Sequence, residues 1–184
     1  MLKWFLRRWI DKFERTWNYD ASYMREVLEA DPRALMTFSK VQGIANYRKD
    51  VPLAAYCAAG IVSAMAEDCG PCTQLAIEMA QREGVDPAIL RAIVKRDLTA
   101  MPYEVALALR FAEASLQRAP EADALREEVV RRFGKRGLIS LSFALVGGRV
   151  FPTLKYALGH GRTCTRLTIG GEQQPVLREL TKAA

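Results

Sequence analysis

Chemically reactive side chains are scarce in this sequence of 184 residues, which contains one histidine and four cysteines. Four cysteines are too few for the disulfide framework of a secreted domain, which is usually shorter and denser in cysteine. A structural zinc site needs four ligands, and the chain has no second pair of closely spaced cysteines or histidines. We therefore expect no bound metal and no cofactor.

Long apolar runs are also lacking. The longest segments without a charged residue span 51–66 and 137–148, fewer than the roughly 18 residues of a membrane-spanning helix. Lys3, Arg7 and Arg8 interrupt what would have to be the apolar part of a signal peptide, and no small-residue cleavage site follows. We therefore expect a cytoplasmic protein. In that reducing compartment a Cys-x-x-Cys motif is more often catalytic than structural.

Acidic residues are absent from one stretch of the chain. Residues 129–171 contain eight Lys or Arg and no Asp or Glu, in a chain of net charge +6. Such a stretch is compatible with an anionic substrate, an acidic partner or nucleic acid. We favour a solvated basic face or an oligomer contact, and we predict no binding of nucleic acid.

Helical patterns dominate what is present. Half of the residues are hydrophobic, and they recur mostly at steps of three and four. Asp31–Pro32 and Asp86–Pro87 each place a capping side chain before a proline that suits the first helical position. We predict an all-α fold in one domain over residues 1–184, with a core at about 20–166 and an irregular tail at 167–184, where a short last helix could form. Further helices are expected at 2–17, 52–67, 69–83 and 138–158, and after Pro102 and Pro120. The helix after Pro120 should end at Gly134, and the helix at 138–158 should bend at Gly147–Gly148 or Pro152.

The helix at residues 2–17 combines aromatic and basic residues, such as Trp4, Phe5 and Trp9 among Lys and Arg. One interpretation places it on an anionic membrane surface. The other packs it on a neighbouring subunit or on the core of its own chain. We favour packing, because Asp11 and Glu14 dilute the basic face.

The most specific motif is Cys69-Gly70-Pro71-Cys72 at the expected start of a helix. Residues three apart share a helix face, so that modest adjustment brings the two sulfurs into bonding range. The unpaired N–H groups and the positive dipole end of a first turn stabilise a thiolate, which is the reactive form of cysteine. The motif predicts a redox-active dithiol. A thioredoxin fold is excluded, since no strand precedes the motif.

Residues 53–116 resemble the alkylhydroperoxidase D-like, carboxymuconolactone decarboxylase family. The resemblance rests on an alanine-rich helix, the Cys69–Cys72 motif opening the next one, the segment Gly84-Val-Asp-Pro-Ala-Ile-Leu90, and Arg110-Phe-Ala-Glu-Ala114. It implies an alkylhydroperoxidase-like helical bundle, here with an extra N-terminal amphipathic helix, that assembles into trimers or hexamers. It also implies that Cys72 attacks peroxide and that Cys69 resolves the product, whereas a thioredoxin analogy reverses these roles.

The chain departs from the family pattern at two positions. The family has a histidine four residues after the second cysteine, where this chain has Ala76, and a glutamate twelve residues before the first, where it has Cys57. Glu67, and also Asp68, could supply a substitute base, or the two could simply favour the start of the helix. The charge of a nearby carboxylate raises a thiol pKa unless the carboxylate accepts the proton, so the sign of its effect stays open.

These features predict an enzyme that cycles Cys69 and Cys72 between dithiol and disulfide, with Glu67 as a third candidate catalytic residue. It would reduce hydroperoxides or partner disulfides, and a dithiol protein would regenerate it. Two alternatives stay open: a lyase acting on a small carboxylic substrate, as in some members of the family, and a non-enzymatic oligomeric adaptor, in one version at a membrane surface. His160 and Cys164 are expected to be structural rather than part of the site.

Overall fold

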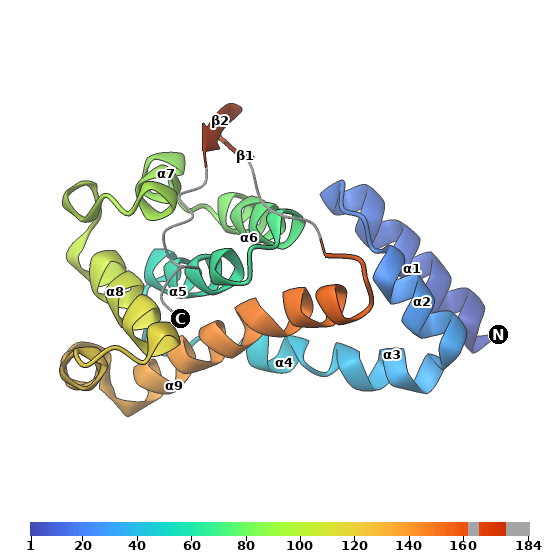
Figure 1. Ribbon diagram of the computed structural model, residues 1–184, viewed down its shortest axis with the longest axis horizontal. Helices are drawn as coiled ribbons and strands as arrows, with labels where there is room; N and C mark the ends of the chain where they lie inside the picture. The colour runs from blue at the N-terminus through green and yellow to red at the C-terminus, as the bar shows by residue number, and fades with distance from the viewer. Residues whose placement is uncertain (162–165, 176–184) are drawn as a thin grey trace.

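The structure is a computed structural model, and it describes residues 1–161 and 166–175. It is almost entirely helical, which confirms the all-α prediction (Figure 1). The helices are α1 (Leu2–Trp17), α2 (Ser22–Ala30), α3 (Pro32–Ser39), α4 (Gln42–Ala45), α5 (Leu53–Ala66), α6 (Gly70–Arg82), α7 (Pro87–Lys95), α8 (Tyr103–Gln117) and α9 (Ala122–Ala157), with a 3₁₀ turn at Leu98–Ala100.

Two helix starts follow from local chemistry, as the sequence predicts. The Asp31 carboxylate accepts a hydrogen bond from the backbone N–H of Arg33 at 2.8 Å, and Asp86 accepts one from Ala88 at 2.7 Å. In each case the proline that follows occupies the first helical turn, where its missing N–H leaves no hydrogen bond unmade. These caps set the beginnings of α3 and α7.

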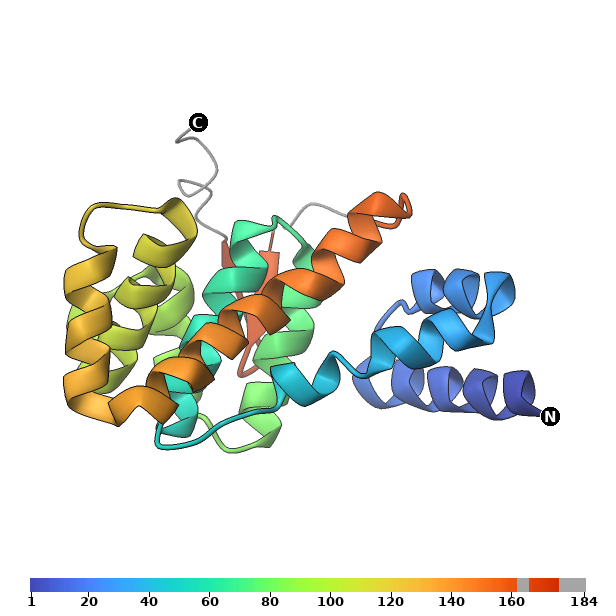
Figure 2. The same ribbon diagram turned by 90° about the horizontal axis from the view of Figure 1, so that it is seen from below.

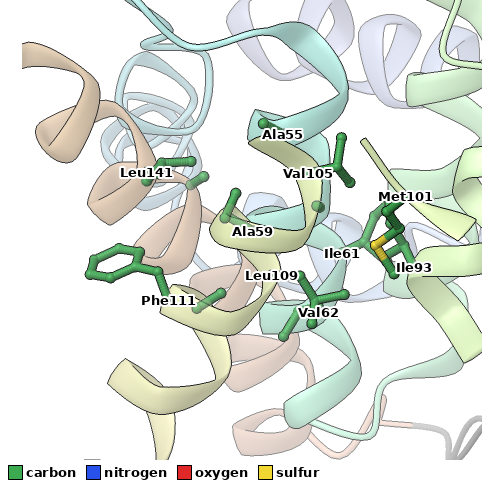
Figure 3. Packing of buried hydrophobic residues seen from close by; sticks show 14 of the residues in the cluster. Ala55, Ala59, Ile61, Val62, Ile93, Met101, Val105, Leu109, Phe111 and Leu141 are labelled. Carbon is green, nitrogen blue, oxygen red and sulfur yellow. The ribbon is translucent and has the colours of Figure 1, made fainter. Parts of the chain in front are cut away.

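The main core surrounds α5, which packs against α6, α7, α8 and α9 (Figures 1 and 3). Ala55, Ala58 and Ala59 are fully buried, and their small side chains allow close approach of the neighbouring helices. A Cβ atom at Gly148 of α9 would lie 2.6 Å from the carbonyl oxygen of Gly60 and from Cβ of Ser63, both on α5. A residue without a side chain is therefore required where α9 crosses α5.

The helix α9 consists of two helical segments that meet at Gly134, whose φ of 69° and ψ of 179° lie outside the helical region (Figure 2). The predicted helix end at Gly134 is confirmed as this break. Within the part of the chain that the structure describes, α9 alone is long and apolar enough to cross a membrane by these two criteria. Core helices meet the same criteria, and α9 buries Ser140, Leu141 and Lys155. Localisation stays a prediction.

The sequence suggested an irregular tail at 167–184. The structure instead has two strands in the segment 166–175. Strands β1 (Arg166–Ile169) and β2 (Glu172–Pro175) form an antiparallel hairpin. Gly170 and Gly171 both have positive φ, which a two-residue hairpin turn of this kind requires. Leu167 and Ile169 are buried in the main core, so the core extends past residue 166. The short last helix considered for the tail would lie in residues 176–184, outside the described residues.

The first three helices enclose a second hydrophobic cluster at one end of the molecule (Figures 1 and 2). Ile10 of α1 and Leu28 of α2 are fully buried in it. The guanidinium of Arg82 on α6 donates to the carbonyl of Thr16 and lies 4.1 Å from the centre of the Trp17 ring, which ties α1 to α6. The helix α1 thus packs its inner face on its own chain. The sequence patterns did not predict α2.

Candidate dithiol site

The two cysteines of the motif lie in contact at the start of α6. Cys69 is the N-cap residue, Gly70 and Pro71 open the helix, and Cys72 completes the first turn. The two Sγ atoms are 2.8 Å apart, and both cysteines are free thiols. The predicted juxtaposition of the two sulfurs on one helix face is therefore present.

Both sulfurs are withdrawn from solvent to different degrees. Cys69 has no exposed surface, whereas 8% of Cys72 is exposed. The Thr73 hydroxyl donates to the carbonyl of Cys69 at 3.0 Å, which fixes the backbone at the entry to the helix. The pair as a whole is therefore largely shielded from solvent.

Tyr19 and Lys155 complete the site from distant parts of the chain. The Tyr19 hydroxyl lies 3.6 Å from Sγ of Cys72, and the Lys155 amine donates to that hydroxyl at 3.2 Å. Since the Tyr19 oxygen accepts from Lys155, its own proton is available to the sulfur. The result is a chain of polar contacts from Lys155 through Tyr19 to Cys72 and Cys69.

Lys155 is itself buried, with 2% of its surface exposed. Its Nζ lies 4.6 Å from the centre of the Tyr19 ring and 5.4 Å from that of Tyr23. No carboxylate pairs with Lys155 among residues 1–161 and 166–175. A buried ammonium is costly unless an anion compensates it. A thiolate at the adjacent cysteine pair would provide that negative charge.

The surroundings of the two thiols push their pKa values in opposite directions. The side-chain hydrogen bond between Cys69 and Cys72 lowers the pKa of Cys69 to about 7, and the backbone N–H of Cys72 and the charge of Lys155 act in the same direction. The same contact with Cys69, together with burial, raises the pKa of Cys72. Burial keeps Tyr19 protonated by raising its pKa. These opposite shifts mean that the first negative charge on the pair is carried by Cys69.

The acidic residues before the motif have other roles. Glu67 forms an ion pair with Arg149 at 2.5 Å, and its second oxygen accepts from the Thr153 hydroxyl at 3.4 Å, so α9 holds both oxygens. No hydrogen bond joins Glu67 to either sulfur in the described part of the chain. The charge of Asp68 raises the pKa of Cys69. The suggested role of Glu67 as a base remains a prediction, without a direct contact to support it.

Neither His160 nor Cys57 forms a hydrogen bond with the motif cysteines among the contacts of the described residues. His160 bonds through Nδ1 to the Ser22 hydroxyl at 3.1 Å and through Nε2 to Glu26 at 2.6 Å, so it joins the end of α9 to α2. Burial and the charge of Glu83 raise the pKa of Cys57 to about 12, as expected of an unreactive thiol. Cys164 lies outside the described residues.

Sequence reasoning missed Tyr19, Tyr23 and Lys155. Tyr19 lies between α1 and α2 and Tyr23 lies in α2, a helix that the sequence patterns did not predict, so no spacing pointed to this pair. Lys155 stood within an apolar helical stretch, where a charged residue often has a specific partner. In the sequence it is one of the eight basic residues of the stretch 129–171.

Comparisons with family models, with curated proteins and with solved structures gave no match. The class of protein is therefore described from its own fold and site geometry. It is a helical protein with a buried pair of cysteines at a helix start, flanked by a tyrosine and a buried lysine. The family resemblance of residues 53–116 remains a prediction.

Proposed function

We propose that the protein is a thiol-dependent oxidoreductase that cycles Cys69 and Cys72 between dithiol and disulfide. The observation that carries the proposal is the 2.8 Å contact between the two sulfurs beside the Tyr19–Lys155 pair. In one turnover the dithiol and a hydroperoxide give the disulfide, an alcohol and water. A dithiol reductant then restores the thiols and is itself oxidised to a disulfide, so electrons and protons balance.

Small hydroperoxides fit the site better than protein disulfides as the oxidant. Only 8% of Cys72 and none of Cys69 is exposed, so a bulky disulfide would need the chain around the pair to open before it could reach sulfur. A hydroperoxide needs access to one sulfur only. The family resemblance favours the same substrate class.

Cys72 is the proposed nucleophile because this residue keeps some exposed surface, whereas Cys69 has none, and because the resemblance assigns this step to it. When peroxide arrives, the proton of Cys72 passes across the short contact to the Cys69 thiolate. The Cys72 thiolate then attacks the terminal peroxide oxygen, which forms a sulfenic acid and releases an alkoxide. Cys69 subsequently attacks the Cys72 sulfur, forming the disulfide and releasing the sulfenic oxygen as water.

Tyr19 is the proposed proton donor to the leaving alkoxide. Its hydroxyl touches Cys72, and its elevated pKa keeps it protonated until it is needed. Lys155, bonded to the same oxygen, would stabilise the phenolate that results. This arrangement would substitute for the histidine and glutamate of the family pattern, whose positions are occupied by Ala76 and Cys57.

The two cysteines are tested separately with hydroperoxide in a background that carries Cys57→Ser and Cys164→Ser. We expect Cys69→Ser to consume one equivalent of peroxide and to accumulate a sulfenic acid that dimedone traps. Cys72→Ser should form no such adduct. Catalytic turnover with a dithiol reductant should be lost in both variants, because neither can form the disulfide.

Two results would contradict the proposal in different ways. If the adduct forms in Cys72→Ser but not in Cys69→Ser, the roles of the cysteines are reversed and the redox function stands. If the double variant Cys69→Ser, Cys72→Ser reduces peroxide as fast as the parent, the dithiol is not the catalyst. Turnover of a small lactone by that double variant would instead support lyase chemistry.

A further inference from the structure

The outer side of α1 exposes large apolar side chains that no other part of the described chain covers. Leu2, Trp4, Phe5 and Trp9 expose between 37% and 61% of their surface. The opposite side of the helix carries Ile10, which is fully buried on α2 and α3. Folding of the N-terminal cluster therefore accounts for the inner side only. Exposed aromatic residues gathered on one helix face indicate a contact with something else.

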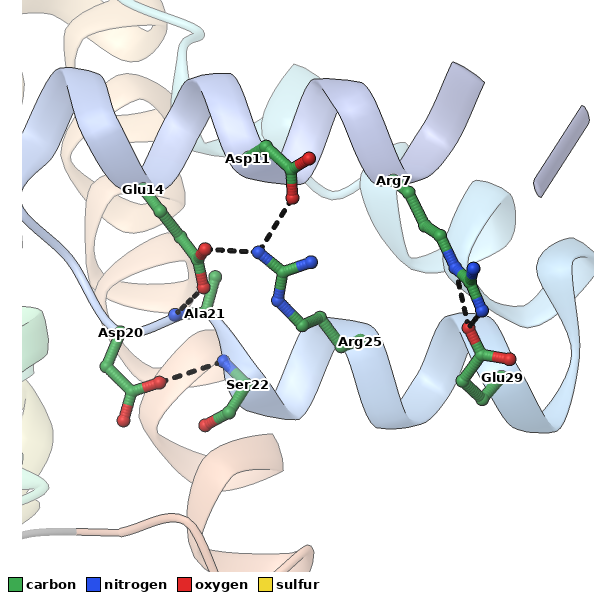
Figure 4. A network of polar contacts seen from close by, with 8 residues as sticks. All are labelled: Arg7, Asp11, Glu14, Asp20, Ala21, Ser22, Arg25 and Glu29. Atoms are coloured by element: carbon green, nitrogen blue, oxygen red, sulfur yellow. Dashed lines mark hydrogen bonds and ion pairs between the residues drawn. The ribbon is translucent and has the colours of Figure 1, made fainter. Parts of the chain in front are cut away.

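The acidic residues of α1 point away from this outer side. Asp11 and Glu14 both pair with Arg25 of α2, as Figure 4 shows. Glu14 also accepts from the backbone N–H of Ala21 at 3.1 Å. The negative charges that seemed in the sequence to dilute the basic face are thus neutralised within the helical hairpin.

The basic residues divide into two groups. Lys3 and Arg7 pair with Glu29 of α2. Arg8, Lys12 and Arg15 are exposed and form no ion pair with any residue in the described ranges 1–161 and 166–175. These three follow Trp4 at steps of four and three, so they share one helix face. The Arg8 guanidinium lies 5.1 Å from the centre of the Trp4 ring.

We infer that this α1 outer face, formed by Leu2, Trp4, Phe5, Arg8, Trp9, Lys12 and Arg15, docks on the surface of an anionic lipid bilayer. Trp and Phe side chains partition into the headgroup region of a bilayer, and Lys and Arg are attracted to anionic lipid. The helix would lie in the plane of the membrane surface with its inner side still packed on α2. The inference does not depend on the redox chemistry of the dithiol.

Two other occupants fit the α1 outer face less well. A second copy of the chain in a two-fold contact would bring Arg8, Lys12 and Arg15 against the same cations of its partner. Nucleic acid would match the charge, but it offers no apolar interior for Leu2 and Phe5. A bilayer with anionic headgroups satisfies both the charge and the apolar surface.

Co-sedimentation of the full chain with vesicles tests the inference. We expect binding to vesicles that contain phosphatidylglycerol and much weaker binding to phosphatidylcholine alone. Each basic residue near an anionic surface contributes about fivefold to binding, so the variant Arg8→Glu, Lys12→Glu, Arg15→Glu should bind on the order of a hundredfold more weakly. The variant Trp4→Ser, Phe5→Ser should also lose affinity, because its inserted surface is removed.

A matched control makes the same change of charge elsewhere. Lys95, Arg110 and Arg118 are exposed on and beside α7 and α8, away from the N-terminal helices (Figure 1), and their replacement by Glu should leave sedimentation at the parental level. Parental binding by the α1 charge variant would overturn the inference. The inference would also be overturned if the parent does not bind vesicles but forms a dimer that the Trp4→Ser, Phe5→Ser variant abolishes. Tighter binding to duplex nucleic acid than to anionic vesicles would overturn it as well.

Discussion

At the scale of single residues, Lys155 supplies the buried positive charge of the site. Its amine donates to the Tyr19 hydroxyl and lies near the Tyr19 and Tyr23 rings, and its charge lowers the pKa of Cys69. Formation of a disulfide would remove the thiolate and leave this ammonium without its nearest negative charge. The residue is therefore expected to favour the reduced, singly charged state of the pair.

Replacement of Lys155 by Met tests this effect on the redox equilibrium. Removing the cation should raise the Cys69 pKa and lower the reduction potential of the pair, because the thiolate loses its stabilising charge. Each unit of pKa corresponds to about 30 mV for a two-electron couple. Equilibration with glutathione buffers measures the potential. Lys135→Met, a change at an exposed site of the same helix, should leave it unaltered, and an unchanged potential in Lys155→Met would contradict the argument.

The opposite pKa shifts of the two cysteines predict a characteristic titration. Ultraviolet absorbance of the reduced protein should show one thiolate appearing with a midpoint near pH 7, since the pKa of Cys69 is lowered to about 7. Cys69→Ser should remove this step. Cys57→Ser should not, because the Cys57 pKa is raised to about 12. A pair of thiolates appearing together above the ordinary cysteine range would be inconsistent with the site.

The same shift fixes the sign of a pH effect on stability. A thiol whose pKa is lower in the folded than in the unfolded protein adds stability above its unfolded pKa. That contribution is lost as pH falls through the folded pKa, here about 7 for Cys69. The parent should therefore lose more stability than Cys69→Ser as pH is lowered from the alkaline range to neutrality, which denaturant titration measures.

At the scale of elements, the C-terminal hairpin belongs to the body of the protein. The amide side chain of Gln74 on α6 bonds to both backbone groups of Thr168 in β1, at 2.8 and 3.0 Å, as a neighbouring strand would. Gln81 accepts from the backbone N–H of Gly170 at 2.8 Å. Together with the burial of Leu167 and Ile169, these bonds hold the hairpin against the helix that begins with the dithiol.

Truncation of Leu167 tests the importance of this hairpin. Its side chain is 1% exposed, and Leu167→Ala should reduce the free energy of unfolding by about 2–5 kcal/mol. Thr168→Ala, at the exposed neighbouring position, should cost much less, because only its backbone is used. Denaturant unfolding monitored by circular dichroism measures both. Equal, small effects would show that the hairpin does not contribute to the core.

At the scale of the whole molecule, the dithiol lies where the two hydrophobic clusters meet. The helix α6 supplies Ile77 to the main core, whereas its Leu75 packs on the N-terminal cluster. Beyond Gly134, α9 also connects the two clusters: Leu141 is buried in the main core, and Leu154 packs against the N-terminal cluster. This course places Lys155 next to Tyr19, and both next to the start of α6. The N-terminal helices thus form one wall of the site.

The sequence by itself determined the features that depend on neighbours along the chain. The caps at Asp31 and Asp86, the helix break at Gly134 and the start of α6 at the cysteine motif follow from interactions over a few residues. The hairpin was missed because two strands of four residues each are too short for a clear alternating pattern. Its Gly170–Gly171 turn was visible in the sequence, but only burial of Leu167 and Ile169 makes the strands stable.

Tertiary structure alone decided what surrounds the sulfurs. Tyr19 lies 53 positions from Cys72 and 136 positions from Lys155 along the chain, and no local pattern relates residues at such separations. The site is assembled when α9 crosses α5 and the segment between α1 and α2 brings Tyr19 to Cys72 at the start of α6. The sequence could therefore indicate a dithiol, whereas its charge, access and proton partners depend on packing between distant helices.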